Sequence, residues 1–315
     1  MASVTLVEAA KLAQDDLVAG IIETLITVNP MFEVIPMDGI DGNALAYNRE
    51  LVAGDVQMLN VGGTITAKAA ATFTNVTSRL TTIIGDAEVN GLVQATRSGD
   101  GNDQTAVQVA SKAKSTARQW QDMFINGDTG TSAYEFDGLI TLCASGQTIS
   151  STGTHGDALS FAAMDNALDL VIDRDGQVDF ITTNARTIRV YKALLRGLGG
   201  ASISEVIELP SGATVPVYSG VGMFRNDWVA IDESKGNSSD LTSVFVGNFD
   251  DGSRDTGCAG ITAQNASGIE IEDVGVHQSR DERITRVKWY CGLALFSELG
   301  LSRISEIGPT TATPT

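Results

Sequence analysis

The sequence predicts an α+β protein with two interleaved lobes, and three features of the 315-residue chain lead to this fold class. A long amphipathic helical pattern covers residues 103–126. Alternating apolar and polar residues, typical of strands, dominate residues 31–89 and return from residue 212 onward. No linker rich in Pro, Ser or charge separates these regions. We therefore expect the long helix and the strands to share one core.

The helical pattern of residues 103–126 has an apolar face built mainly of small side chains. Two aromatic rings end this face, which comprises Val109, Ala113, Ala117, Trp120 and Phe124. Asp103 is placed to cap the first free amides, and Gly127 is placed to end the helix in a left-handed conformation. Because small residues let another layer approach closely, we expect these five residues to pack against a sheet.

Residues 5–28 predict a second amphipathic helix, which Asn29 and Pro30 would end. Leu17 and Ile21 lie on its apolar face. A terminal helix has to bury such a face, and we expect residues 1–30 to form an arm that packs on a neighbouring subunit.

A long projecting hairpin is predicted for residues 45–85, approximately. Strand patterns lead into and out of a polar segment rich in Gly and Ala, with Gly62 and Gly63 as the turn signal. An isolated two-stranded hairpin is marginally stable in water, so we expect this one to lie on a partner. Bending is expected at Gly54, at Gly85 and at the glycine turn.

The remaining elements predict a second lobe and a set of returning strands. Helix, strand and helix patterns follow one another at residues 157–173, 178–183 and 184–200, with Asn184 as a helix cap. Residues 138–232 are therefore expected to form an α/β lobe. Later strands end in one long run at residues 282–307, which we expect to return to the first lobe before a polar, Pro-containing tail.

Charge and cysteine content exclude several classes of protein. The formal net charge is −18, so a surface that grips nucleic-acid phosphates is not expected. The three cysteines, Cys143, Cys258 and Cys291, are far apart and odd in number, which favours buried thiols over a disulfide framework. The N-terminus lacks a basic n-region and carries Glu8, Asp15 and Asp16, so no signal peptide is predicted. The sequence has no apolar run of about 18 residues, so no membrane span is predicted.

No pattern in the sequence predicts catalysis, a cofactor or a metal ion. The two histidines, His155 and His277, stand apart from other candidate ligands. Asp173, Asp175 and Asp179 resemble a calcium loop, but its first and last ligand positions are held by Val171 and Thr182. Phosphate-binding, nucleophile-elbow and zinc-protease motifs are also absent from the sequence.

The order of these elements resembles the major capsid proteins of tailed bacteriophages, which have the HK97-like fold. The resemblance covers nearly the whole chain and rests on the order and spacing of seven stretches: IPMDGIDGNALAYNREL, FTNVTSRLTTIIG, DMFINGDTG before FDGLI, TTNARTIRVYKALL, GATVPVYS, VFVGNFDDG and the closing strand. The INGD turn is the most specific of them.

The resemblance implies a division of the chain into the parts of a capsid subunit. Residues 1–30 would be the N-arm; residues 31–137 would hold the extended loop and the peripheral domain, with residues 103–126 as its spine helix. Residues 138–232 would be the axial domain, and residues 233–315 would return to the peripheral domain. Contacts between subunits are expected through arm and hairpin residues: Leu17, Ile21, Arg49, Glu50, Lys68 and Phe73.

The expected function is therefore structural: hexamers and pentamers of the chain would form an icosahedral shell around double-stranded DNA, without binding the DNA specifically. Because the arm helix begins near Met1, the resemblance implies a separate scaffolding protein, or none. It also implies a portal protein, with a decoration protein as a further candidate partner. The shell would assemble in the cytoplasm of the bacterial host. A cellular nanocompartment shell of the encapsulin type is the alternative, and a soluble α/β enzyme ranks third.

Lys68 is the one residue for which the resemblance raises a chemical role. Some shells of this family link a hairpin lysine covalently to an asparagine of a neighbour. A solvated lysine, or an ion pair with an acidic neighbouring surface, is the simpler interpretation and the one we favour.

Overall fold

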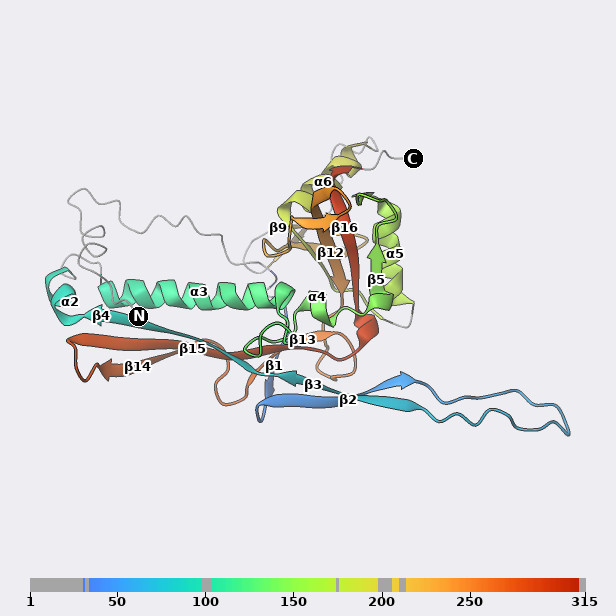
Figure 1. Ribbon diagram of the computed structural model, residues 1–315, viewed down its shortest axis with the longest axis horizontal. Helices are drawn as coiled ribbons and strands as arrows, with labels where there is room; N and C mark the ends of the chain where they lie inside the picture. Colours follow the sequence, from blue (N-terminus) through green and yellow to red (C-terminus); the bar gives the residue numbers. More distant parts are fainter. Residues whose placement is uncertain are drawn as a thin grey trace.

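The computed structural model describes residues 31, 34–97, 103–173, 176–197, 206–209 and 214–311. The predicted arm helix, with Leu17 and Ile21, lies outside these residues. The described chain forms an elongated layer of helix on sheet, a second lobe beside it, and a two-stranded hairpin that projects from the molecule (Figure 1).

The first sheet is organised around its longest strand, β15 (Glu282–Leu295). One side of β15 pairs over ten residues with β4 (Thr81–Asn90). Its other side pairs with β14 (Glu270–Val276) and then with β13 (Cys258–Ala263). Parallel to β13 lies β1 (Met37–Ile40), so the described sheet has five strands.

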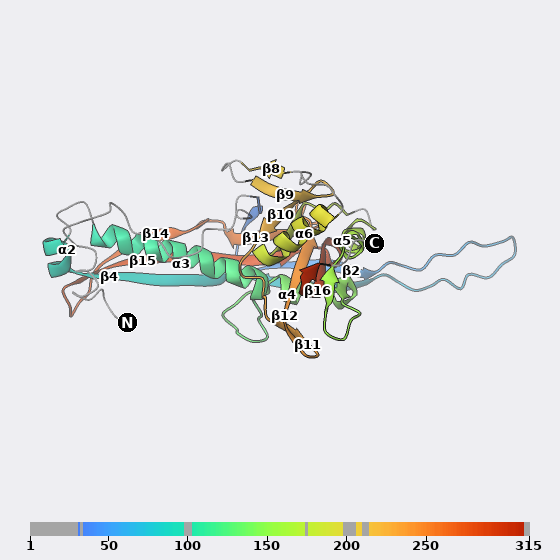
Figure 2. The ribbon, with the colours of Figure 1, turned by 90° about the horizontal axis from the view of Figure 1, so that it is seen from above.

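The spine helix, α3 (Gln104–Asn126), lies along one face of this sheet (Figures 1 and 2). Trp120 stacks on Phe124 of the same helix and on Trp289 of β15, with ring centroids 5.3 and 5.7 Å apart. Trp120 and Phe124 are buried, as their positions predict, whereas Val109, Ala113 and Ala117 are half-buried. The aromatic end of this apolar face is therefore covered more fully than the part formed by the small residues.

Both ends of α3 are defined by local contacts. The Asp103 carboxylate accepts a hydrogen bond from the Thr105 amide, which confirms the predicted N-cap. The prediction for Gly127 was wrong, because its φ is −57° rather than left-handed. A Cβ at this position would lie 2.2 Å from the Phe136 carbonyl oxygen. Glycine is thus required by the close approach of the following loop, not by a positive φ.

The second lobe contains a nine-stranded described sheet with two helices packed on it. Its helices are α5 (Phe161–Ile172) and α6 (Ala185–Gly197). The Asn184 side chain accepts a hydrogen bond from the Thr187 amide, as expected of a helix cap. The strands are β5 (Thr148–Ser150), β6 (Asp157–Leu159), β7 (Phe180–Thr183), β8 (Val206–Glu208), β9 (Thr214–Tyr218), β10 (Val221–Arg225), β11 (Glu233–Lys235), β12 (Ser238–Gly247) and β16 (Leu301–Thr311).

Residues 233–315 were expected to return to the first lobe. This expectation was wrong for two long strands of the segment. Both β12 and β16 belong to the nine-stranded sheet, where they pair with each other. The predicted run 282–307 is therefore two strands, β15 and β16, separated by the short 3₁₀ helix η3 (Glu298–Gly300). Ile304 and Ile307 of β16 complete the hydrophobic core of the second lobe, and this burial fixes the strand there.

Short elements connect these layers. The helix α2 (Gly91–Arg97) joins β4 to the spine helix, and α4 (Leu139–Leu142) and η2 (Ser145–Gln147) lead from the spine helix into the second lobe. The helix predicted from residue 157 begins later, because residues 157–159 form β6 and Ser160 caps α5.

The hairpin consists of β2 (Ala44–Val52) and β3 (Thr72–Arg79), which pair with each other and with no other described strand. Gly85 was expected to be a bend at its base. It lies instead within β4, opposite Val287, in an uninterrupted ladder. Bending at this position would break sheet hydrogen bonds, so the expectation was wrong.

Two side chains fasten the base of the hairpin to the corner between β15 and β16. The Tyr47 hydroxyl donates to the Leu295 carbonyl at 2.6 Å, and Arg49 Nε donates to the Phe296 carbonyl at 2.8 Å. The Arg49 guanidinium also reaches the Leu295 carbonyl and lies 2.7 Å from a Glu298 carboxylate oxygen. Arg49 was expected to contact a neighbouring subunit, but these contacts occupy it within its own chain.

The three cysteines are free. Cys258 and Cys291 are buried, and Cys143 is half-buried. Burial raises the pKa of Cys258 to about 12, and it also raises the pKa of Cys143 and Cys291. The thiols are therefore protonated and poorly reactive at neutral pH.

Replacing Trp120 by Ala is expected to lower the free energy of unfolding by about 3–5 kcal/mol, because the change leaves a cavity between α3 and β15. Urea denaturation of the unassembled chain measures this loss. Gln119 is exposed on the same helix, and Gln119→Ala serves as the control, with an expected change within about 0.5 kcal/mol. Equal losses for the two variants would contradict the stacking role of Trp120.

Replacing Arg49 by Ala is expected to loosen β2, because three half-buried acceptors lose their charged donor. The free energy for opening β2 should fall by about 1–3 kcal/mol. Hydrogen exchange of peptides covering residues 44–52 should become about tenfold faster. Arg49→Lys should rescue only part of the protection, because an ammonium group cannot reproduce the guanidinium fork. Glu50→Gln, at the exposed neighbouring position, is the control. Unchanged exchange in both Arg49 variants would contradict the role of Arg49 in holding β2 to the corner.

Candidate assembly surfaces

The far part of the hairpin is extended but hardly paired. We call residues 53–71, between the ends of β2 and β3, the hairpin tip. A single backbone hydrogen bond joins its two arms, from the Asp55 amide to the Ala69 carbonyl at 3.0 Å. The glycine turn predicted from the sequence is present, with Gly62 at a φ of 85°. Most backbone donors and acceptors of the tip are therefore left to solvent or to a partner.

One side chain holds the arms of the tip together. The Gln57 amide oxygen accepts hydrogen bonds from the Thr66 and Ala67 amides at 2.7 and 2.6 Å, and from the Thr66 hydroxyl. Its amide nitrogen donates to the Thr64 carbonyl at 3.1 Å. Sequence patterns did not single out this residue, since a lone exposed Gln carries no periodic signal.

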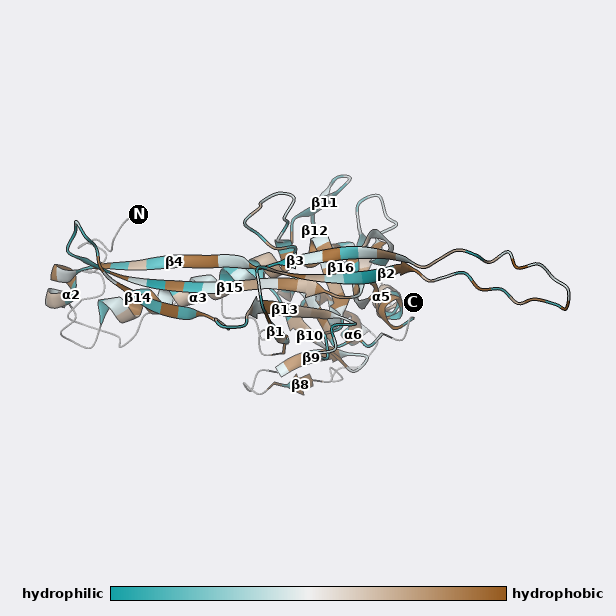
Figure 3. Cartoon of the chain, turned by 90° about the horizontal axis from the view of Figure 1, so that it is seen from below, coloured by the Kyte–Doolittle hydropathy of each residue, from teal (hydrophilic) through white to brown (hydrophobic). Residues whose placement is uncertain are grey.

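Large apolar side chains of the tip face solvent in the described chain. Met58 and Val61 are completely exposed, and Val56 is 89% exposed. Further exposed apolar residues follow along both arms: Leu51, Val52, Leu59, Ile65 and Phe73. In Figure 3 the apolar residues recur along this projecting loop, far from either core. Exposed apolar surface on this scale is typical of an interaction site.

The hairpin residues predicted to contact neighbours have different environments. Glu50 and Phe73 are exposed and lie opposite each other on β2 and β3. Lys68 is exposed on the tip and makes no ion pair within the described chain. The structure thus leaves Glu50, Lys68 and Phe73 available, while Arg49 is occupied by the corner.

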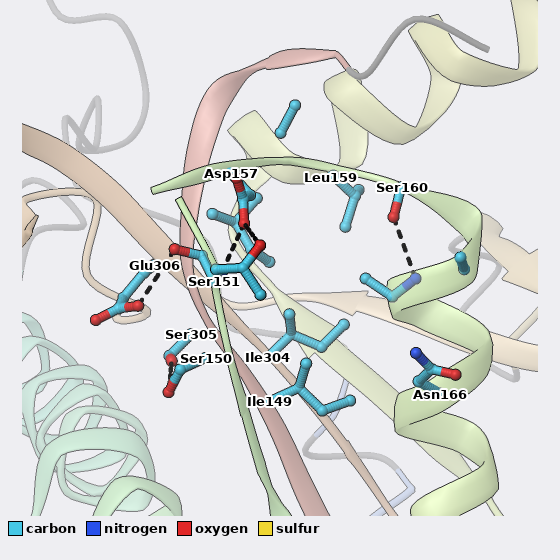
Figure 4. A pocket seen from close by; sticks show the side chains of 15 residues that line it. Ile149, Ser150, Ser151, Asp157, Leu159, Ser160, Asn166, Ile304, Ser305 and Glu306 are labelled. Atoms are coloured by element: carbon cyan, nitrogen blue, oxygen red, sulfur yellow. Dashed lines mark hydrogen bonds between the residues drawn. The ribbon is translucent and has the colours of Figure 1, made fainter. Parts of the chain in front are cut away.

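A cavity of about 500 Å³ lies between α5 and the strands β5, β6 and β16 (Figure 4). Its acidic groups are already bound. The Asp157 carboxylate accepts hydrogen bonds from the Gly153 and Thr152 amides, and these bonds lower its pKa. Glu306 accepts from Lys235 at 2.6 Å. No histidine or cysteine is among the residues that line the cavity.

The two histidines have structural contacts. His155 Nδ1 accepts the Asn237 amide at 3.0 Å, and His277 Nδ1 accepts the Ser279 amide at 3.2 Å. In the sequence segment that resembled a calcium loop, Asp179 accepts the Phe249 amide and Asp173 ends α5. The described residues contain no group of side chains that could hold a metal ion.

Comparisons with known proteins agree with a shell protein. Residues 47–218 match the sequence model of the family described as SU10 major capsid protein, which is more than half of the chain. No curated protein matches the chain.

Solved structures share the fold at low sequence identity. The holo-SrpI encapsulin complex of Synechococcus elongatus PCC 7942 is 14% identical, covers 100% of this chain and 99% of its own, and has a TM-score of 0.73. The capsid of a native GTA particle is 11% identical over 96% of this chain and 97% of its own, with a TM-score of 0.65.

The structure from Mycobacterium phage Ogopogo is 14% identical over 96% of this chain and 99% of its own, with a TM-score of 0.63. These likenesses confirm the HK97-like capsid fold. The match over residues 47–218 shows that the chain is a phage major capsid protein. The chain belongs to the SU10 major capsid protein family.

Proposed function

We propose that the chain self-assembles, as hexamers and pentamers, into the icosahedral shell that encloses the double-stranded DNA of a tailed bacteriophage. The family membership supports a capsid role. In this proposal the first sheet and α3 form the peripheral domain, and the nine-stranded sheet forms the axial domain.

The surface of the hairpin tip is the observation that supports self-assembly. Its exposed apolar side chains and unpaired backbone cannot be stabilised by its own chain, because an isolated two-stranded ribbon is marginal in water. A neighbouring copy would cover this surface. In a closed shell each copy would both give and receive such a contact, so modest contacts would add up through their number.

The enclosed DNA would be contained without specific binding. The chain carries 39 acidic and 21 basic side chains, a balance that disfavours tight contact with phosphates. We propose no catalytic activity, in keeping with a family of structural proteins.

Other proteins would complete the particle. We propose a separate scaffolding protein, a portal protein and a decoration protein as partners, with assembly in the cytoplasm of the bacterial host. Within the described residues, none of the helices has the length and apolar character needed to cross a membrane.

An encapsulin-type nanocompartment is the second candidate. The likeness to the SrpI encapsulin complex, with a TM-score of 0.73 over the whole chain, favours it. The contents of particles purified from the natural source distinguish the two functions: genome-length DNA supports the phage shell, and a protein cargo supports the nanocompartment.

Replacing the hairpin tip by an Asn-Gly turn tests the proposed function. The variant should stay folded and soluble but form no closed particles, because the apolar contact surface is removed. Electron microscopy and sedimentation compare it with the unaltered chain and with a control that changes only Gly62 to Asn and so keeps the tip at full length. Closed particles of normal size from the shortened chain would overturn the proposed role of the tip.

Lys68 is expected to make no covalent link in the assembled shell. Denaturing electrophoresis of purified particles should give a single band at the mass of one chain, because a single exposed lysine is an ordinary solvated surface group. A ladder of covalent multimers that disappears in Lys68→Arg would contradict this expectation, since arginine cannot form the isopeptide bond.

A further inference from the structure

The strand β4 (Thr81–Asn90) has an unpaired outer edge. Its inner edge pairs with β15 at ten consecutive positions, and no other described strand pairs with it. Figures 2 and 3 agree that β4 forms the border of the sheet, opposite β14. In an antiparallel ladder the N–H and C=O groups of every second residue point away from the partner. About half of the β4 backbone therefore presents free donors and acceptors outward.

Apart from the charged side chains of Asp86 and Glu88, this edge lacks the devices that usually prevent strand pairing. Its register with β15 is uninterrupted, and its sequence, TTIIGDAEVN, contains neither Pro nor Lys. The opposite border strand differs. Between Asp273 and Gly275 the register of β14 shifts in a bulge, with Gly275 at a φ of 100°. Bulges disrupt a ladder and turn an edge away from partners, so β4 is the border suited to receive a strand.

The hairpin tip also has few backbone hydrogen bonds of its own. The Asp55 to Ala69 bond is its single cross-arm backbone hydrogen bond, apart from the turn at Gly63. The arm of residues 63–71 is nine residues long and β4 is ten, so both extend over about 30 Å at about 3.3 Å per residue. The arm and the outer edge of β4 are extended and of similar length, so they can satisfy each other's backbone groups.

Charge favours the same pairing. Lys68 is the single basic residue of the tip, and the outward face of β4 carries Asp86 and Glu88. Asp86 is held by Arg286 at 2.7 Å, whereas Glu88 makes no ion pair within the described chain. The arm of residues 63–71 is thus basic and β4 is acidic, so pairing between two copies brings segments of opposite charge together.

We propose that the outer edge of β4 receives the arm of residues 63–71 from the hairpin tip of a second copy, as an added strand. This inference rests on the proposed self-assembly and specifies which surface of the neighbour the tip contacts. Main-chain hydrogen bonds supply the pairing, and alternate side chains of the arm, such as Ile65, pack beside Ile84 of β4, which is 55% exposed.

Disulfide trapping in assembled particles tests the pairing. Chains carrying Ile84→Cys together with Ile65→Cys or Ala67→Cys should form covalent multimers on oxidation, visible in non-reducing electrophoresis, because directly opposed residues of paired strands bring their Cβ atoms close enough. The native thiols interfere little, since Cys258 and Cys291 are buried and their pKa is raised.

The control uses the opposite border of the sheet. Ile271 of β14 is 58% exposed, much like Ile84, so Ile271→Cys combined with the same tip cysteines should remain monomeric. Linkage through Ile271→Cys in place of Ile84→Cys would overturn the proposal. Multimers of chains carrying Ile84→Cys alone would also overturn it, because they would show that two β4 edges meet.

Hydrogen exchange of the unaltered chain provides a measurement that needs no variant. Peptides covering residues 81–90 should exchange about tenfold more slowly in particles than in unassembled chains, and peptides covering residues 63–71 should slow with them. Particles in which the exchange of β4 is unchanged would overturn the strand addition and leave the proposed shell function intact. Failure of the unaltered chain to form particles even in the presence of its scaffolding protein would instead contradict the shell function itself.

Discussion

The carbonyl groups of Leu295 and Phe296 stand at the corner on which the other parts of the molecule depend. There β15 leaves one sheet, the chain turns through η3, and β16 enters the other sheet. Carbonyls at such a corner need other donors once sheet pairing ends, and the side chains of Tyr47 and Arg49 supply them. Charge-assisted hydrogen bonds are stronger than neutral ones, and Arg49 is largely shielded from water. The two sheets and the hairpin are thereby joined at one place, so the direction of the hairpin follows the arrangement of the sheets.

This arrangement gives the subunit closed apolar cores inside and incomplete borders outside. The rings of Trp120 and Trp289 stack between α3 and β15, and the apolar cores of both lobes are closed. At the hairpin tip and at the β4 edge, by contrast, apolar side chains or backbone groups face outward. A subunit that is rigid inside and incomplete at its borders gains stability when its copies associate, because burial and backbone pairing are then completed between chains.

The charge of the chain limits how such copies can associate. With a formal net charge of −18 each, identical subunits repel one another at long range. Several cations are already used within the first sheet: Arg286 is paired with Asp86, and Lys288 lies between Glu270 and Glu272. These basic groups are therefore not available to offset charge between copies. Apolar burial and main-chain hydrogen bonds are independent of the sign of charge, which is why an exposed apolar hairpin and an unpaired strand edge are suitable contact surfaces for this chain.

The sequence by itself determined the elements whose signals are local: the spine helix with its Asp103 cap, the helix capped by Asn184, and the hairpin with its glycine turn. Periodicity and caps depend on neighbours along the chain, so they are visible in the sequence. Tertiary structure alone decided that β16 joins the second sheet, that Arg49 binds the corner, and that Gly127 is required by the nearby Phe136 carbonyl. Each of these depends on an approach between groups that lie on separate elements or across a loop. An apolar run states that a strand is buried but not against which sheet, and a lone arginine does not indicate whether its acceptors belong to its own chain or to a neighbour.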